Sequence, residues 1–124
     1  MKQCAIHVLD GPVTYFALPS KRCAFPLTGL ARWFDRKPST VRLAAHRRTL
    51  ITVCRAHTRE VCLDAVDLAR FLLKATRRAG NSAGIRQRCW ALLAALQHHL
   101  QIDVQRLLRE SFAEEEARLF ASKV

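Results

Sequence analysis

The stretch Leu27–Leu50, LTGLARWFDRKPSTVRLAAHRRTL, constrains the fold most, because it predicts two short helices joined by a tight basic turn. Its first part has the i, i+3, i+4, i+7 spacing of one buried helical face, carried by Leu27, Leu30, Ala31 and Phe34. A proline disfavours helical geometry in the residue before it, so Pro38 interrupts the first helix. Proline is tolerated in the first turn of a helix, so a second helix begins near Pro38.

The second predicted helix has an apolar side and a polar side. Its inward stripe is Val41, Ala44 and Ala45, whereas Ser39, Arg42 and His46 lie together on the opposite side. A helix, a turn of three or four residues and a second helix with a basic outer face are typical of a helix-turn-helix. The stretch therefore predicts DNA binding.

The expected contacts follow from the residue types. Backbone N–H groups at the start of the second helix, with the hydroxyls of Ser39 and Thr40, would hold a phosphate. Arg42 and His46, one turn apart, would reach base edges. The predicted DNA-binding residues are Arg36, Lys37, Ser39, Thr40, Arg42, His46, Arg47 and Arg48.

Two alternatives to this interpretation stay open. The pair could be a helical hairpin whose basic face is only solvated. In addition, Leu43 and Leu50 are predicted to point outward, so part of the same face would pack on protein rather than on DNA.

The positive charge of the chain is concentrated in its middle. The formal net charge is +11. Residues 21–88 hold 16 Lys or Arg and 4 Asp or Glu, a balance of +12, and the remainder holds 5 basic and 6 acidic residues, a balance of −1. Such a concentration is expected of a nucleic-acid binder, although an acidic protein or an anionic lipid would also be attracted. Arginine outnumbers lysine, which favours bidentate contacts with phosphate and guanine.

The cysteines do not suggest a disulfide framework or a metal site. They are odd in number, scattered, and without a C-x-x-C pair: Cys4, Cys23, Cys54, Cys62 and Cys89. We expect free thiols that pack as small apolar groups in a reducing compartment. No apolar run is long enough to span a bilayer and no signal-peptide pattern is present, so the expected location is cytoplasmic, with no membrane partner.

No catalytic constellation is recognisable. The chain has no glycine-rich phosphate loop, no nucleophile elbow and no metal-ligand spacing. His98 and His99 are adjacent and so point to different sides of a helix, which is poor geometry for one metal. We therefore expect a protein that is not an enzyme and needs no cofactor.

Two β-hairpins are predicted on either side of the helix pair. Residues 5–18 contain two β-prone runs around a turn at Asp10–Pro12. A connector is predicted over Pro19–Pro26. The runs 50–54 and 60–63 predict a second hairpin. Its tip carries Arg55, His57 and Arg59, which would either touch a phosphate backbone or form an ordinary solvated turn.

Three more helices are predicted, over 64–74, 85–99 and 104–121, the last capped by Asp103. The last helix has an incomplete apolar stripe, formed by Val104, Leu107, Leu108, Phe112, Leu119 and Phe120. It would either close the domain or form a dimer seam. The expected fold is α+β: a small antiparallel sheet of two hairpins packed with four to five helices.

The order of these segments resembles the phage antirepressor N-terminal domain, the BRO-N-like family. The resemblance covers about residues 5–100 and is carried by the segments Asp10–Ala17, Leu30–Phe34, His46–Arg48, Leu50–Cys54, Arg59–Leu72 and Arg86–Leu96. Phe34-Asp35 stand where that family has Leu-Gly at the end of its first helix. The resemblance implies a DNA-binding regulator of phage or mobile-element origin, or a module that inactivates a repressor by binding it without contacting DNA.

A narrower resemblance is to the DNA-binding domain of the bacterial replication initiator DnaA. Its recognition-helix string is matched here by Arg36, Ser39, Thr40, Val41, Ala44 and Arg47. We therefore expect residues 1–100 to form an antirepressor-like DNA-binding domain and residues 101–124 to form a C-terminal helix. The expected partners are double-stranded DNA, a repressor protein as the alternative, and a second copy through that helix.

Overall fold

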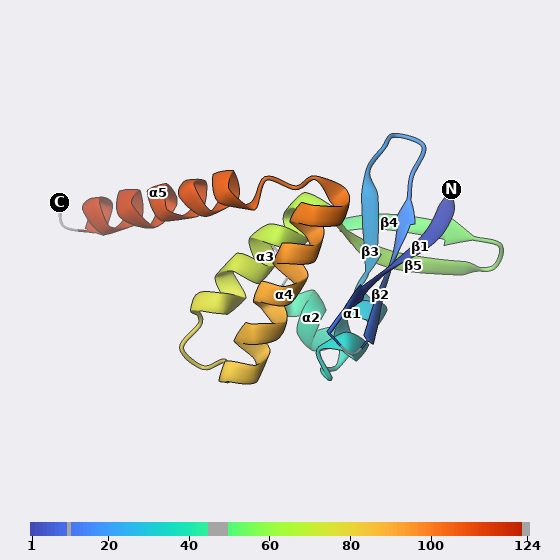
Figure 1. The fold of residues 1–124 in the computed structure, drawn as a ribbon, viewed down its shortest axis with the longest axis horizontal. Helices are drawn as coiled ribbons and strands as arrows, with labels where there is room; N and C mark the ends of the chain where they lie inside the picture. Colours follow the sequence, from blue (N-terminus) through green and yellow to red (C-terminus); the bar gives the residue numbers. More distant parts are fainter. Residues whose placement is uncertain (10, 45–49, 123–124) are drawn as a thin grey trace.

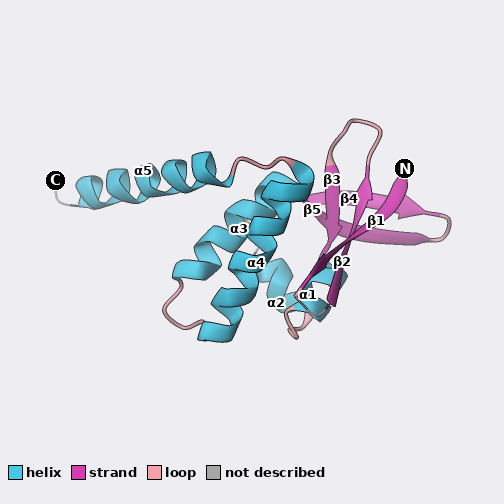
Figure 2. Ribbon diagram, viewed as in Figure 1, coloured by secondary structure: helices cyan, strands magenta, loops and turns pink. Residues whose placement is uncertain are grey.

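The computed structural model describes residues 1–9, 11–44 and 50–122 (Figure 1). Over these residues the chain forms a five-stranded antiparallel sheet packed with five helices, which confirms the predicted α+β fold (Figure 2). The strands are β1 (Lys2–Val8), β2 (Gly11–Ala17), β3 (Cys23–Pro26), β4 (Leu50–Arg55) and β5 (Thr58–Asp64). The helices are α1 (Leu27–Trp33), α2 (Pro38–Ala44), α3 (Ala65–Arg77), α4 (Ala83–Leu100) and α5 (Val104–Ser122).

The prediction of a connector over Pro19–Pro26 was wrong, because its second half is strand β3. The strand lies in the middle of the sheet, whose order is β1-β2-β3-β5-β4. Its Ala24 pairs with Phe16 of β2, and its Phe25 pairs with Leu63 of β5. Four residues ending in a proline are too short to display alternation, yet Ala24 and Phe25 are completely buried. β3 therefore joins the two predicted hairpins into one sheet.

The turn of the first hairpin also differs from the prediction. Val8 pairs with Gly11, so the turn lies between these two residues and Gly11 and Pro12 belong to β2. Leu9 has a left-handed backbone, with φ 57°. Glycine usually supplies that conformation, which is why composition pointed to the wrong part of the loop. Pro12 is tolerated because it lies at the start of a strand.

One face of the sheet packs against α1, α3 and α4 and forms the main core (Figure 1). The sheet contributes Phe25 and Leu63, and the helices contribute Leu30, Leu72 and Leu93; each of these is at most 1% exposed. Burying such a side chain contributes about 1.5–3 kcal/mol relative to leaving it in water. The contact between the two layers therefore dominates the stability of the fold.

The opposite face of the sheet packs around a second, smaller core. Its buried members are Phe16, Ala24, Val53 and Cys62. Arg55 of β4 donates a hydrogen bond of 2.7 Å from Nη1 to Oε1 of Gln3 on β1. The same guanidinium carbon lies 5.4 Å from the centroid of the Phe16 ring. Since β1 and β4 are the two ends of the strand order, this contact reflects a strong twist of the sheet.

Side-chain caps mark the beginnings of α3 and α4, and both helices run further than predicted. Asp64 precedes α3 and accepts a hydrogen bond of 3.1 Å from the N–H of Val66. Ser82 precedes α4 and accepts one of 3.2 Å from the N–H of Ile85. Such caps satisfy N–H groups that have no partner inside the helix.

Among the described residues, no helix combines the length and the apolar character that crossing a membrane requires.

The last helix, α5, packs on the domain along its first part, and its contacts with α3 reach as far as Glu115, which pairs with Arg77 over 3.0 Å. Asp103 caps it as predicted, by accepting a hydrogen bond of 3.0 Å from the N–H of Arg106. Val104 and Leu107 are buried against α3 and α4. Further along, the helix extends away from the rest of the molecule (Figure 1). Leu119 and Phe120 of this second part are exposed by 62% and 65%. Phe112 is exposed by 52%, and its ring centroid lies 5.1 Å from the guanidinium carbon of Arg77 on α3.

Candidate nucleic-acid interface

The predicted pair of helices is present, and its turn has a defined geometry. α1 and α2 pack on each other and are joined by Phe34–Lys37. The N–H of Arg36 donates to the carbonyl of Ala31 over 2.8 Å, and the N–H of Asp35 donates to that of Arg32 over 3.2 Å. These two bonds make a Schellman motif, which needs a left-handed residue after the helix cap. Asp35 supplies it, with φ 55°, at a position where glycine is usual.

The inner side of the pair is apolar and holds it against the sheet. Leu30 and Ala31 of α1 and Val41 of α2 are at most 4% exposed. Trp33 is 7% exposed and packs next to Gly11 at the start of β2. Because this side is buried, the opposite side of the pair faces solvent.

The outer side carries five of the predicted DNA-binding residues. Arg36, Lys37, Ser39, Thr40 and Arg42 are all exposed. Within the described residues none of these side chains makes a hydrogen bond or an ion pair. Three positive charges and two hydroxyl groups are therefore available to a ligand on one side of the helix pair.

Other predictions for this stretch fall outside the described residues. They are His46, Arg47, Arg48 and Ala45, together with the side chains of Leu43 and Ala44. Leu50 was predicted to point outward, and this was wrong. It is the first residue of β4, pairs with Leu63 and lies half-buried against the main core. The helical periodicity does not reach Leu50, because the chain has become a strand there.

The backbone at the start of α2 has fewer N–H groups available to bind a phosphate than predicted. Pro38 has no N–H group. The N–H groups of Thr40 and Val41 already donate to the carbonyl of Lys37, over 3.0 and 3.3 Å. An anion at this position would therefore depend on the hydroxyl groups of Ser39 and Thr40 and on the basic side chains beside them.

Arg88 reaches the end of α1 from a distant part of the sequence. Its Nη1 donates a hydrogen bond of 2.8 Å to the carbonyl of Trp33, and its guanidinium carbon lies 5.4 Å from the centroid of the Trp33 ring. Arg86 on the same helix donates to the carbonyls of Arg78 and Ala79 over 3.1 and 3.4 Å. Sequence reasoning missed the link to α1, since its only signal was two arginines at the start of a predicted helix.

Several arginines elsewhere are paired with carboxylates. The pairs are Arg22–Asp64 at 3.3 Å, Arg70–Asp67 at 3.3 Å, Arg77–Glu115 at 3.0 Å and Arg106–Glu110 at 3.7 Å. Exposed pairs of this kind contribute little to stability, but they neutralise charge locally. The basic residues of the α1–α2 turn have no such neutralising partner among the described residues.

The second basic candidate, the tip of the β4–β5 hairpin, is smaller than predicted. Arg55 pairs with Thr58, so the turn consists of Ala56 and His57. Arg55 is held by Gln3 and the Phe16 ring, as described above. The tip projects from the sheet, away from α2 (Figure 1). It does not join the surface of the helix pair.

The cysteines are free, and Cys62 and Cys89 are buried. Burial raises the pKa of the Cys62 thiol to about 12, with a smaller contribution from Glu60. Burial likewise raises the pKa of the Cys89 thiol to about 11. Both thiols are therefore protonated at neutral pH, which makes them poor nucleophiles and poor metal ligands. In the described ranges, no three His, Cys, Asp or Glu residues gather where they could hold a metal ion.

Comparison of the chain with protein-family models, with curated proteins and with solved structures finds no significant match.

Proposed function

We propose that this chain is a small sequence-specific DNA-binding transcriptional regulator, similar to a phage antirepressor N-terminal domain, and that its α1–α2 pair contacts duplex DNA. The observation that carries the proposal is a set of exposed side chains on the outer side of this pair that have no protein partner within residues 1–9, 11–44 and 50–122. They are Arg36, Lys37, Ser39, Thr40 and Arg42.

The role of each group follows from its chemistry. Arg36 and Lys37 lie in the turn and are suited to phosphates, where they release counterions. Arg42 lies on the exposed side of α2, and its planar guanidinium suits a bidentate contact with guanine. Ser39 and Thr40 can donate hydrogen bonds to phosphate oxygens. The excess of +12 over residues 21–88 supports attraction to a polyanion.

The test is the binding of the purified chain to a fluorescently labelled random duplex, followed by anisotropy across a salt series. Log affinity should fall linearly with log salt, by about 0.9 for each phosphate neutralised. The variant Arg36→Ala/Arg42→Ala should weaken binding and reduce this slope by about one unit, because only Arg36 of the two is assigned to a phosphate. On a selected operator, Arg42→Ala alone should cost about 1–3 kcal/mol and relax the sequence preference.

A matched control removes the same charge from elsewhere on the chain. Lys21→Ala/Arg118→Ala lowers the net charge by two, but Lys21 lies in the β2–β3 turn and Arg118 near the end of α5. This variant should bind with nearly the affinity of the parent chain. Equal loss in both double variants would contradict a site on the helix pair, and absence of binding at low salt would contradict DNA binding altogether.

A second candidate function is supported by the exposed apolar residues of α5. A protein-interaction module that inactivates a repressor would use such a surface and would not need DNA. Its affinity for the repressor would depend weakly on salt, whereas DNA binding falls steeply with salt. Capture of a repressor by the Arg36→Ala/Arg42→Ala variant, together with no DNA binding by the parent chain, would favour this candidate.

A further inference from the structure

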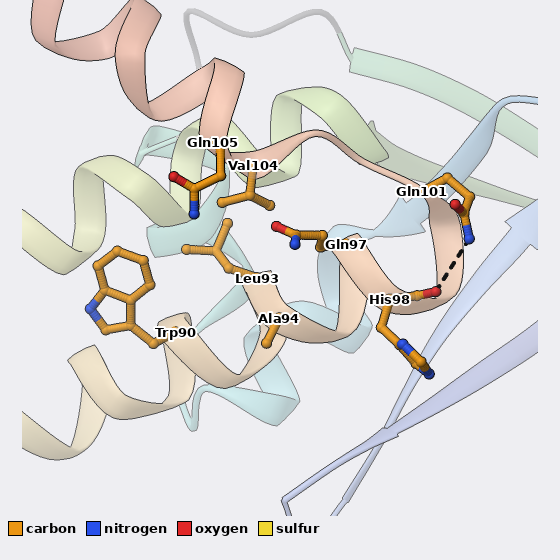
Figure 3. Close-up of a pocket in the computed structure, with 8 residues that line it drawn as sticks. All are labelled: Trp90, Leu93, Ala94, Gln97, His98, Gln101, Val104 and Gln105. Atoms are coloured by element: carbon orange, nitrogen blue, oxygen red, sulfur yellow. Dashed lines mark hydrogen bonds between the residues drawn. The ribbon is translucent and has the colours of Figure 1, made fainter.

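A hollow of about 480 Å³ lies between α4 and the beginning of α5 (Figure 3). Trp90 and Leu93 of α4 line one side, and Val104 and Gln105 of α5 line the other. Trp90 is 47% exposed. A large aromatic side chain beside an open hollow offers apolar area that binding would bury.

The hollow continues into a stripe along α5 that is half-buried at Leu108 and exposed beyond it. Gln105, Leu108, Phe112 and Leu119 are separated by three, four and seven residues, which places them on one face of the helix. Phe112 and Leu119 are more than half exposed. The surface therefore runs from the hollow to the projecting end of α5.

Two unpaired charges border this stripe. Arg109 and Glu116 are exposed and make no ion pair within the described residues. They are seven residues apart, about two helical turns, so they lie on the same side of α5. By contrast, Glu110 pairs with Arg106 and Glu115 pairs with Arg77.

We propose that the occupant of this surface is a second copy of the chain, with the two α5 helices antiparallel and crossing near Phe112. Arg109 and Glu116 lie on opposite sides of the midpoint between Phe112 and Ala113. In an antiparallel pair, each Arg109 therefore faces Glu116 of the partner subunit. One two-fold operation satisfies all four charges, as a self-complementary interface requires.

The spacing also brings the apolar end of α5 to the hollow. Leu119 and Phe120 lie about 10–12 Å beyond Phe112 along the helix axis, and Gln105 lies about 10 Å before it. An antiparallel partner therefore places its Leu119 and Phe120 over Gln105 and Trp90. The exposed side chains of each copy cover the hollow of the other, so the interface closes as a dimer and does not extend into a filament.

The first test is sedimentation of the full chain over a concentration series without DNA, so its result does not depend on the proposed function. The parent chain should dimerise. Arg109→Glu and Glu116→Arg should each weaken the dimer at least about tenfold, because like charges then face each other. The double variant Arg109→Glu/Glu116→Arg should restore dimerisation. Arg118→Glu is the matched control, since Arg118 borders the groove beside Lys74 and Arg77 and should leave the dimer unchanged.

The second test follows the hollow itself. The emission of Trp90 should shift to shorter wavelength as the concentration rises, and the shift should be absent in Trp90→Phe. Leu119→Asp should abolish both the shift and the dimer without lowering the melting temperature of the monomer, since Leu119 is 62% exposed. A chain that stays monomeric at all concentrations would overturn the proposal, as would a dimer that neither charge reversal nor Leu119→Asp weakens.

Discussion

Arg88 on α4 donates a hydrogen bond of 2.8 Å to the main-chain carbonyl of Trp33, the last residue of α1. The carbonyls at the end of a helix have no intrahelical partner and carry partial negative charge. A guanidinium that also lies over the Trp33 ring satisfies one of them and gains a cation–π contact. This single side chain fixes the end of the candidate DNA-binding element to the helical layer.

Replacing Arg88 should therefore loosen the helix pair. We expect Arg88→Ala to lower the free energy of unfolding by about 1.5–3 kcal/mol, the range for a hydrogen bond from a charged group. Arg88→Lys should recover only part of the loss, because an ammonium group lacks the planar face that stacks on Trp33. Urea denaturation would measure both. Gln87→Ala, one residue away and exposed, is the control and should change stability by less than about 0.5 kcal/mol.

The left-handed residue of the α1–α2 turn offers a stabilising substitution. Asp35 has φ 55°, where glycine carries no steric penalty. Asp35→Gly should raise the free energy of unfolding by about 0.5–1 kcal/mol, and Asp35→Val should lower it by at least about 1 kcal/mol. Chemical denaturation of the two variants beside the parent would check this. A destabilised glycine variant would mean that the Asp35 side chain has a role beyond its backbone conformation.

The buried thiols predict how stability depends on pH. The pKa of Cys62 is raised from 9.0 to about 12 and that of Cys89 from 9.0 to about 11, chiefly by burial. At a pH above 9.0 and below the raised pKa values, the two thiols stay protonated in the folded chain but lose their protons in the unfolded chain. Stability is therefore complete below about pH 9 and falls as pH rises. The melting temperature should drop as the pH rises from about 9 to about 11. Cys62→Ala/Cys89→Ala should be less stable at the lower pH but show a smaller drop.

Burial also predicts which thiol reacts first. Cys54 is exposed, whereas Cys62 and Cys89 are buried. A thiol reagent such as DTNB should label Cys54 rapidly in the native chain and reach Cys62 and Cys89 only after unfolding. The fast phase should disappear in Cys54→Ser. Rapid labelling of Cys89 in that variant would show that α4 opens readily under native conditions.

Local patterns predicted much of the fold. The helix pair, the second hairpin and the cap at Asp103 follow from periodicity and residue chemistry that act within a few positions. The helix predicted from residue 64 begins one residue later, because Asp64 is its cap. β3 was missed because its stability comes from neighbours on both sides, Phe16 and Leu63, that are distant in the sequence. Tertiary burial overrode the weak local signal of Cys23–Pro26.

The sequence predicted which side of the helix pair is polar, but not which distant residues hold the pair in place. An apolar stripe beginning at Val41 predicted which side of α2 faces solvent, and the buried Val41 and the exposed Ser39 and Arg42 agree with it. The contact of Arg88 with Trp33 joins residues 55 positions apart, so no local pattern could reveal it. The incomplete apolar stripe of α5 was recognisable, but it left open whether the helix closes the domain or forms a dimer seam, since periodicity does not reveal where a helix leaves the core.

The central place of β3 has a consequence for the order in which the chain folds. Ala24 pairs with Asp64, which is forty residues later in the sequence (64 − 24). Closing such a long loop costs entropy that must be offset by contacts formed only afterwards. During synthesis, the first hairpin and the helix pair therefore wait for β5 to leave the ribosome before the sheet is complete. Until that moment the nascent chain exposes an open edge of β3, the segment most prone to pair with another molecule.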